Sequence, residues 1–150
     1  MRNRSILHPR VLRATVLASS MMMGAADAGS ISVTDGWIRA LPGDTPAGGY
    51  FNLANDSGKR IDLTGASSPA CGMLMLHKTE TMGGMAMMND VKQIPLAAGA
   101  HLSFSPGGYH LMCMDPTAAI KPGNKVPVTL EFGDGTKVTA DFTVRNAAGR

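Results

Sequence analysis

The chain has 150 residues, of which 44% are hydrophobic, and a formal net charge of +3. This length is enough for one domain with its own core. Residues 1–28 hold four of the fourteen basic and one of the eleven acidic residues, so ten of each remain and residues 29–150 carry no formal net charge. Because there is also no block of like charges, the sequence argues against nucleic acid or an anionic membrane as a partner.

Residues 1–28 have the composition of a secretory signal peptide. A region with four arginines precedes a mostly apolar run at 14–24, and the segment ends in Ala-Asp-Ala at 26–28. A basic region, an apolar region and an A-x-A end are typical of export signals. The apolar run is shorter than the about twenty residues that a membrane-spanning helix needs. We therefore expect cleavage after Ala28 and a soluble periplasmic protein, with a retained anchor as the alternative.

From residue 29 the chain reads as short strands separated by turns, with no helical period of useful length. In the first half we expect strands at 31–40, 50–54, 60–66 and 71–80. In the second half we expect strands at 85–91, 102–105, 109–114, 125–132 and 136–144. Eight or nine strands at this spacing predict an all-β sandwich. The predicted domain covers residues 29–144, and a short C-terminal tail follows at 145–150.

The glycines at 83 and 84 mark a hairpin between two of these strands. With a four-residue loop at 81–84, a common hairpin length, His77 lies opposite Met88, within about 5 Å at Cβ. A two-residue turn made by the glycines alone would shift this register. The longer loop gives a structural reason for the ten-residue gap between His77 and Met88.

A second histidine–methionine pair lies in the predicted strand at 109–114. His110 and Met112 are two residues apart, so they project from the same face and can bind one ion. Cys113 faces the other way, toward the expected core. Three further methionines share faces with these side chains if the strands are regular, and they would form a soft surface around the site: Met73, Met75 and Met114.

Two imidazoles and two thioethers are a ligand set for Cu(I). Thioethers are soft, neutral ligands that favour Cu(I), and imidazole binds copper among other metals. An exposed thiolate pair would tend to oxidise outside the cytosol, whereas these ligands do not depend on thiol chemistry. Zinc prefers Cys, His and carboxylate ligands, and calcium requires oxygen ligands. The competing interpretation is that methionine fills the core and histidine is solvated, which is how we interpret His101.

Cys71 and Cys113 are the only cysteines of the chain. In an exported protein two cysteines can form a disulfide, but two small buried thiols are an equally good interpretation. The sequence does not place their Cα atoms within bridging distance. It therefore leaves their pairing open.

The spacing of the four candidate ligands resembles the signature of the periplasmic copper chaperones associated with loading the Cu(A) centre of cytochrome c oxidase. The matching pattern is His77-x10-Met88-x21-His110-x-Met112. Flanking runs support the resemblance: Trp37-Ile38-Arg39-Ala40, Gly48-Gly49-Tyr50, His77-Lys78-Thr79-Glu80 and Pro106-Gly107-Gly108-Tyr109-His110-Leu111-Met112. The similarity covers essentially the whole chain after the signal peptide.

This resemblance implies a cupredoxin-like Greek-key β-sandwich with an exposed site that binds Cu(I) through the two histidines and two methionines. It also implies copper delivery to the Cu(A) subunit of the oxidase or to a thioredoxin-like copper chaperone. Those roles carry over to His77, Met88, His110 and Met112 and no further. Because the chain after Val144 has neither His nor Met, we expect one ion per chain, in a monomeric protein.

The leading interpretation is thus a non-enzymatic Cu(I) carrier. A blue-copper electron-transfer protein is one alternative, in which Cys113 would join two histidines and an axial methionine. A secreted β-sandwich interaction module without a metal, whose methionines scavenge oxidants, is another. We find no nucleophile elbow, paired carboxylates or other catalytic motif that would favour an enzyme.

Overall fold

The computed structural model describes residues 31–150. The predicted signal peptide at 1–28 and its cleavage site lie outside the described residues. Within the described part, no helix has the length and apolar character that crossing a bilayer requires.

Ten β-strands make up the described chain. The first five are β1 (Ile31–Arg39), β2 (Ala47–Asn55), β3 (Ile61–Ser67), β4 (Cys71–Met82) and β5 (Met85–Asp90). The others are β6 (Ile94–Leu96), β7 (His101–Phe104), β8 (Tyr109–Pro116), β9 (Lys125–Phe132) and β10 (Lys137–Arg145). The predicted all-β architecture is confirmed. The sequence missed only β6, a short edge strand in which Pro95 is tolerated because edge positions can lack a backbone donor.

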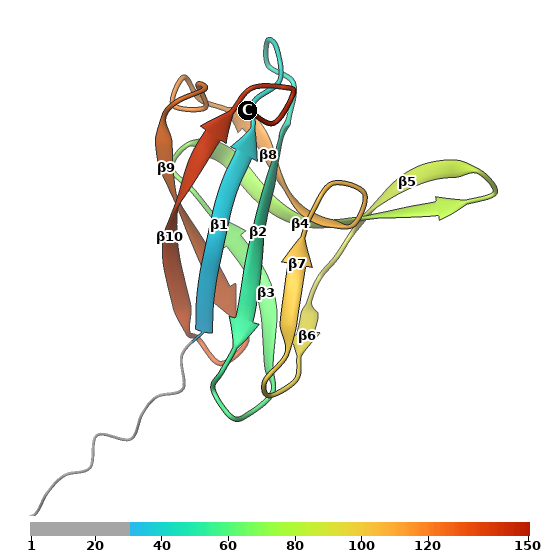
Figure 1. The fold of residues 1–150 in the computed structure, drawn as a ribbon, viewed down its shortest axis with the longest axis vertical. Helices are drawn as coiled ribbons and strands as arrows, with labels where there is room; N and C mark the ends of the chain where they lie inside the picture. The colour runs from blue at the N-terminus through green and yellow to red at the C-terminus, as the bar shows by residue number, and fades with distance from the viewer. Residues whose placement is uncertain (1–30) are drawn as a thin grey trace, which may run out of the picture.

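The strands hydrogen-bond in the order β5-β4-β8-β2-β1-β10-β9-β3-β6, and β7 pairs with β2. Neighbours along this path are antiparallel apart from β1 and β10, which are parallel. Figure 1 shows that the sheet folds over on itself into two layers. The position of β8 between β4 and β2 is what brings the candidate ligands together.

The core between the layers is built from alternating apolar residues, as a half-buried strand pattern predicts. Its centre is a group of aromatic rings, in which Phe51 lies 4.2 Å from Phe104 and 5.5 Å from Phe142, measured between ring centroids. On β8, Leu111 and Cys113 point into this core and are fully buried. The alternate residues of β8 are therefore directed to the opposite face.

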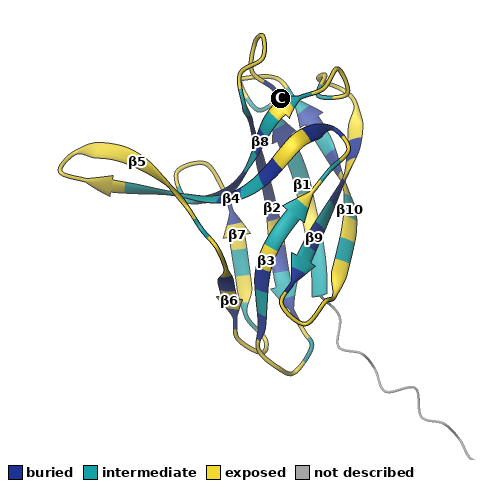
Figure 2. Cartoon of the chain, turned by 180° about the vertical axis from the view of Figure 1, so that it is seen from behind, coloured by how far each residue is buried: buried dark blue, intermediate teal, exposed yellow. Residues whose placement is uncertain are grey.

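The β4–β5 hairpin extends away from the sandwich (Figure 1), and all six residues of β5 are exposed (Figure 2). The predicted four-residue loop at 81–84 is wrong, because Met82 pairs directly with Met85. Gly83 and Gly84 have φ values of 59° and 79°, which fit a two-residue hairpin turn that requires positive φ at both positions.

The end of the chain is more ordered than a loose tail. Arg145 is the last residue of β10 and pairs with Arg39 of β1. After it, the backbone N–H of Asn146 donates to the carbonyl of Arg150 at 2.8 Å, and the N–H of Gly149 donates to the carbonyl of Asn146 at 2.8 Å. Residues 146–150 thus form a closed turn.

Candidate metal centre

Three cross-strand pairs of soft or imidazole side chains lie along β4 and β8. The pairs are Met73–Met114, Met75–Met112 and His77–His110. Directly opposite residues of an antiparallel pair project to the same face, and so do residues two apart along a strand. The six side chains therefore line one face, opposite to the core, and we call them the His/Met ladder.

His110 presents one ring nitrogen that lacks a hydrogen-bonding partner. The residue is only 4% exposed, and its Nδ1 lies 3.2 Å from the carbonyl oxygen of Gly108. Since a carbonyl only accepts, this contact places the proton on Nδ1 and the lone pair on Nε2. Nε2 is buried without a partner, whereas buried polar atoms are nearly always hydrogen-bonded. It is therefore free to act as a metal ligand.

The surroundings of His110 favour its neutral, metal-binding form. Burial lowers the pKa of His110 below its ordinary value of 6.5, the contact with Gly108 opposes this, and the neighbouring His77 lowers it further. A histidine must be deprotonated at the nitrogen that binds a metal. The lowered pKa therefore favours the neutral form, in which that nitrogen can bind a metal.

His77 completes the pair of imidazoles. Its ring centroid lies 5.7 Å from that of His110, with the ring planes at 69°. Nε2 of His77 is 3.2 Å from Oδ1 of Asp90, although neither ring nitrogen has a partner in hydrogen-bonding geometry. A carboxylate next to one nitrogen of a ligating histidine commonly orients the ring. Asp90 is placed to do this and leaves Nδ1 of His77 for the ion.

Met88 lies on the same face as His77 but not opposite to it. With the two-residue turn, Asp90 pairs with His77 and Met88 pairs with Thr79. Met88 is therefore the diagonal neighbour of His77, a spacing of about 7–8 Å that a long side chain can bridge. The side chain is 62% exposed. The predicted direct pairing of His77 with Met88 is wrong because the turn has two residues instead of four. Met88 nevertheless lies on the predicted face.

Met75 is closer to the proposed ligands than the sequence indicates. It lies directly opposite Met112 and is half-buried, whereas Met73, one pair further along the ladder, is 58% exposed. The sequence assigned Met73, Met75 and Met114 alike to a surrounding surface. The register of β4 against β8 separates them, and this register could not be read from the sequence because the two strands are far apart in the chain.

An aromatic wall on β1 and β2 lies beside His110, on the side of β8 that faces away from β4. The ring centroid of Tyr50 lies 6.5 Å from that of His110 and 4.6 Å from that of Trp37. The Arg39 guanidinium packs 5.4 Å from the Trp37 ring and 5.5 Å from the Tyr50 ring. Gly48 makes room for this wall, because a Cβ there would lie 2.6 Å from Oη of Tyr50. In the sequence these residues stand out only because they lie in the runs that support the family resemblance; their position beside His110 was not predicted.

Cys71 and Cys113 form a disulfide, with their Cα atoms 5.4 Å apart. Cys113 is fully buried on the core side of β8, so its sulfur lies on the face opposite to Met112. The bond ties the start of β4 to β8 directly behind the ladder. It also engages the thiolate that a blue-copper site would require.

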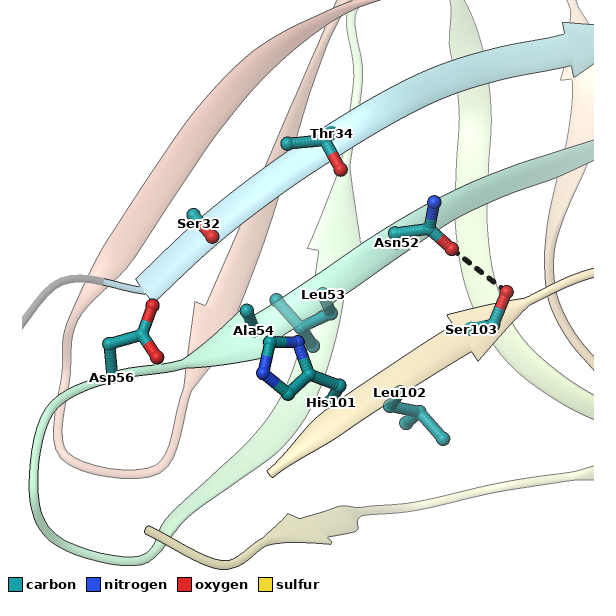
Figure 3. Close-up of a pocket in the computed structure, with 9 residues that line it drawn as sticks. All are labelled: Ser32, Thr34, Asn52, Leu53, Ala54, Asp56, His101, Leu102 and Ser103. Carbon is teal, nitrogen blue, oxygen red and sulfur yellow. Dashed lines mark hydrogen bonds between the residues drawn. The ribbon is translucent and has the colours of Figure 1, made fainter. Parts of the chain in front are cut away.

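Other features of the described chain are less suited to a soft metal. In residues 31–150 no group of three or more His, Cys, Asp or Glu side chains could hold a metal ion. A hollow of about 510 Å³ lies over β1, β2 and β7 (Figure 3). Its lining combines apolar side chains, such as Leu53 and Leu102, with hydroxyl, amide and carboxylate groups and the imidazole of the exposed His101. The Ser103 hydroxyl donates to Oδ1 of Asn52 at 2.9 Å. No methionine lines this hollow.

Solved structures with a similar fold include PCuAC domains. The copper-bound PCuAC domain from PmoF2 is 25% identical, with a TM-score of 0.65 over 79% of this chain and 95% of that domain. The solution structure of CuI-DR1885 from Deinococcus radiodurans is 31% identical, with a TM-score of 0.65 over 81% of this chain and 83% of that one. By fold the chain is thus a cupredoxin-like β-sandwich, as predicted, and it is similar to PCuAC domains.

The sequence family is defined by a separate comparison. A family model described as "LpqE-like: Putative lipoprotein LpqE-like" matches residues 31–144, and the chain belongs to this LpqE-like family. A relative named "Putative lipoprotein Lxx21020", from Leifsonia xyli subsp. xyli (strain CTCB07), is 30% identical over 155 residues. The alignment covers 93% of each chain.

Proposed function

We propose that this protein is a periplasmic metallochaperone whose cargo is Cu(I), bound by His77, Met88, His110 and Met112. The observation that carries the proposal is the buried, unpartnered Nε2 of His110, on the same face as His77 and Met112. A neutral imidazole beside soft thioethers favours Cu(I) over harder ions. The names of the two similar structures, one copper-bound and one CuI-loaded, support the same metal.

The cargo would be handed over by ligand exchange, without catalysis. His110 is held by its contact with Gly108 and by burial, so it stays in place. Met88 lies on a fully exposed strand and can leave the ion at little cost. An incoming ligand of the acceptor would replace this thioether first, so that copper is never free in solution.

The proposed acceptor is the Cu(A) subunit of cytochrome c oxidase or a thioredoxin-like copper chaperone. This part of the proposal rests on the resemblance of the four-ligand spacing, and the periplasmic location rests on the signal-like composition of residues 1–28. The Cys71–Cys113 disulfide supports an oxidising compartment, because such bonds persist mainly outside the cytosol.

Anaerobic competition with a chromophoric Cu(I) chelator tests the ligand assignment. Replacing a side chain that supports a metal ligand typically costs about 10–100-fold in affinity, so His110→Ala and Met112→Ala should each weaken Cu(I) binding by more than about 100-fold. The matched control is His101→Ala, which changes an exposed histidine outside the ladder. Unchanged affinity in both ladder variants, with the fold intact by circular dichroism, would show that copper binds elsewhere.

A further inference from the structure

Three methionines of the β4–β5 hairpin lie on the face that the His/Met ladder does not use. Met82 pairs directly with Met85, and Met87 pairs with Glu80. Side chains alternate along a strand, and Met88 shares the face of His77. Met82, Met85 and Met87 therefore project together from the opposite face, which we call the outer face of the hairpin.

Core packing does not account for these three side chains. Met82, Met85 and Met87 are 63%, 71% and 48% exposed. Their hairpin stands clear of the sandwich (Figure 2), so nothing within the described chain covers the outer face. A methionine usually fills irregular gaps in a core, and these three fill none.

The hairpin fixes the spacing of the three thioethers. Directly opposite residues such as Met82 and Met85 have Cβ atoms about 4.5–5.5 Å apart. Met85 and Met87 are two residues apart on one strand, which is about 7 Å. A methionine side chain has three rotatable bonds, so three sulfurs starting from these positions can reach one point above the strand pair.

The polar neighbours on the outer face are already engaged. Nζ of Lys78 lies 2.9 Å from Oε1 of Glu80, and Nδ2 of Asn89 donates to Oε2 of the same carboxylate at 3.3 Å. Both oxygens of Glu80 thus have partners. The other side chains on the outer face near the hairpin tip are the thioethers of Met82, Met85 and Met87, which favour soft ions over hard ones.

We propose that Met82, Met85 and Met87 form a second, all-thioether site for a soft monovalent cation of the Cu(I) class. It is weaker than the ladder site because it has no imidazole and is open to solvent. This changes the expected capacity from one ion per chain to two. Because Met87 and Met88 are neighbours on β5 and project from opposite faces, the two sites lie on opposite faces of one strand. That the ladder fills first rests on the proposed function.

Methionine-methyl NMR during titration with Ag(I), a soft cation that does not oxidise in air, tests the second site. In the wild-type protein the first equivalent should shift the methyl signals of Met88 and Met112. The second equivalent should shift those of Met82, Met85 and Met87. In the triple variant M82L/M85L/M87L the protein should bind one equivalent, and the control His101→Ala, which changes an exposed residue outside both the ladder and the hairpin, should still bind two.

Three outcomes would overturn the second site: only one equivalent bound by the wild type, two equivalents bound by the triple variant, or movement of the outer-face methyls together with Met112 at the first equivalent. Leu is close to Met in volume and the replaced side chains are exposed, so the fold should persist. His110→Ala separates this proposal from the proposed function. It should weaken binding of the first equivalent at the ladder and leave the outer-face shifts, and an unaffected first equivalent would contradict the ladder assignment alone.

Discussion

The two strands that supply methionine to the candidate centre, β8 and β5, differ in how firmly they hold it. Met112 lies half-buried on β8, which has β4 on one side and β2 on the other. Met88 is 62% exposed on β5, the terminal strand of the sheet order, with a single neighbour. One half of the site is therefore part of the sandwich, and the other half lies on the projecting β4–β5 hairpin.

This difference suits a carrier that must hold an ion and also give it up. The β8 side has a buried imidazole, an aromatic wall and a disulfide behind it, so its ligands are already in position before copper arrives. The β5 side pairs only with β4 and contributes no residue to the core. Binding strength should therefore depend mainly on β8, and exchange should depend mainly on β5.

The largest expected effect is on the unfolding free energy, from removing the Cys71–Cys113 disulfide that lies behind the ladder. Cys71 and Cys113 are separated by 42 positions, for which loop-closure entropy predicts about 4 kcal/mol of stabilisation. The double variant C71A/C113A should lose about this much unfolding free energy in urea denaturation and should bind Cu(I) more weakly. A loss below about 1 kcal/mol would show that the disulfide does not stabilise the β8 side.

A substitution on the β4–β5 hairpin should have a smaller effect, on Cu(I) affinity and not on stability. Met88→Leu should weaken Cu(I) binding about tenfold, or about 1.4 kcal/mol, and leave the unfolding free energy unchanged because the residue is exposed. Met112→Leu should weaken binding more, since it removes a ligand from the preformed side. Chelator competition and urea denaturation on both variants measure this contrast, and a larger affinity loss in Met88→Leu would reverse it.

The smallest effect concerns the pH dependence of stability. The folded-state pKa of His110 is below its ordinary value of 6.5, so between the two values the unfolded chain binds more protons than the folded one. Stability therefore rises with pH in this window and is lost as pH falls below about 6.5. In metal-free protein, the stability of wild type relative to His110→Gln should shrink from pH 7.5 to pH 5. A gap that stays constant would contradict burial of a neutral ring.

Much of the fold follows from the sequence because strand periodicity is local. The alternation of His110, Leu111, Met112 and Cys113 correctly separated the face of the candidate ligands from the core side. The strands themselves were also predicted, apart from β6. These features depend on neighbouring residues and turn signals alone.

What could not be predicted depends on turn choice and on pairing between distant strands. Two glycines that both adopt positive φ moved Met88 from opposite His77 to opposite Thr79. Met75 lies opposite Met112, and Tyr50 lies beside His110, because of strand pairings that no local sequence pattern encodes. Such pairings follow from how the whole sheet buries its apolar face.

The most direct test of the Cu(I) site is X-ray absorption on protein loaded anaerobically with less than one equivalent of Cu(I). With the ion shared between the two histidines and two methionines, the spectrum should require both nitrogen and sulfur scatterers in about equal number. A smaller nitrogen contribution in His110→Ala would assign the missing part to this ring. A wild-type spectrum that is fitted by nitrogen and oxygen alone, without sulfur, would contradict the His/Met site.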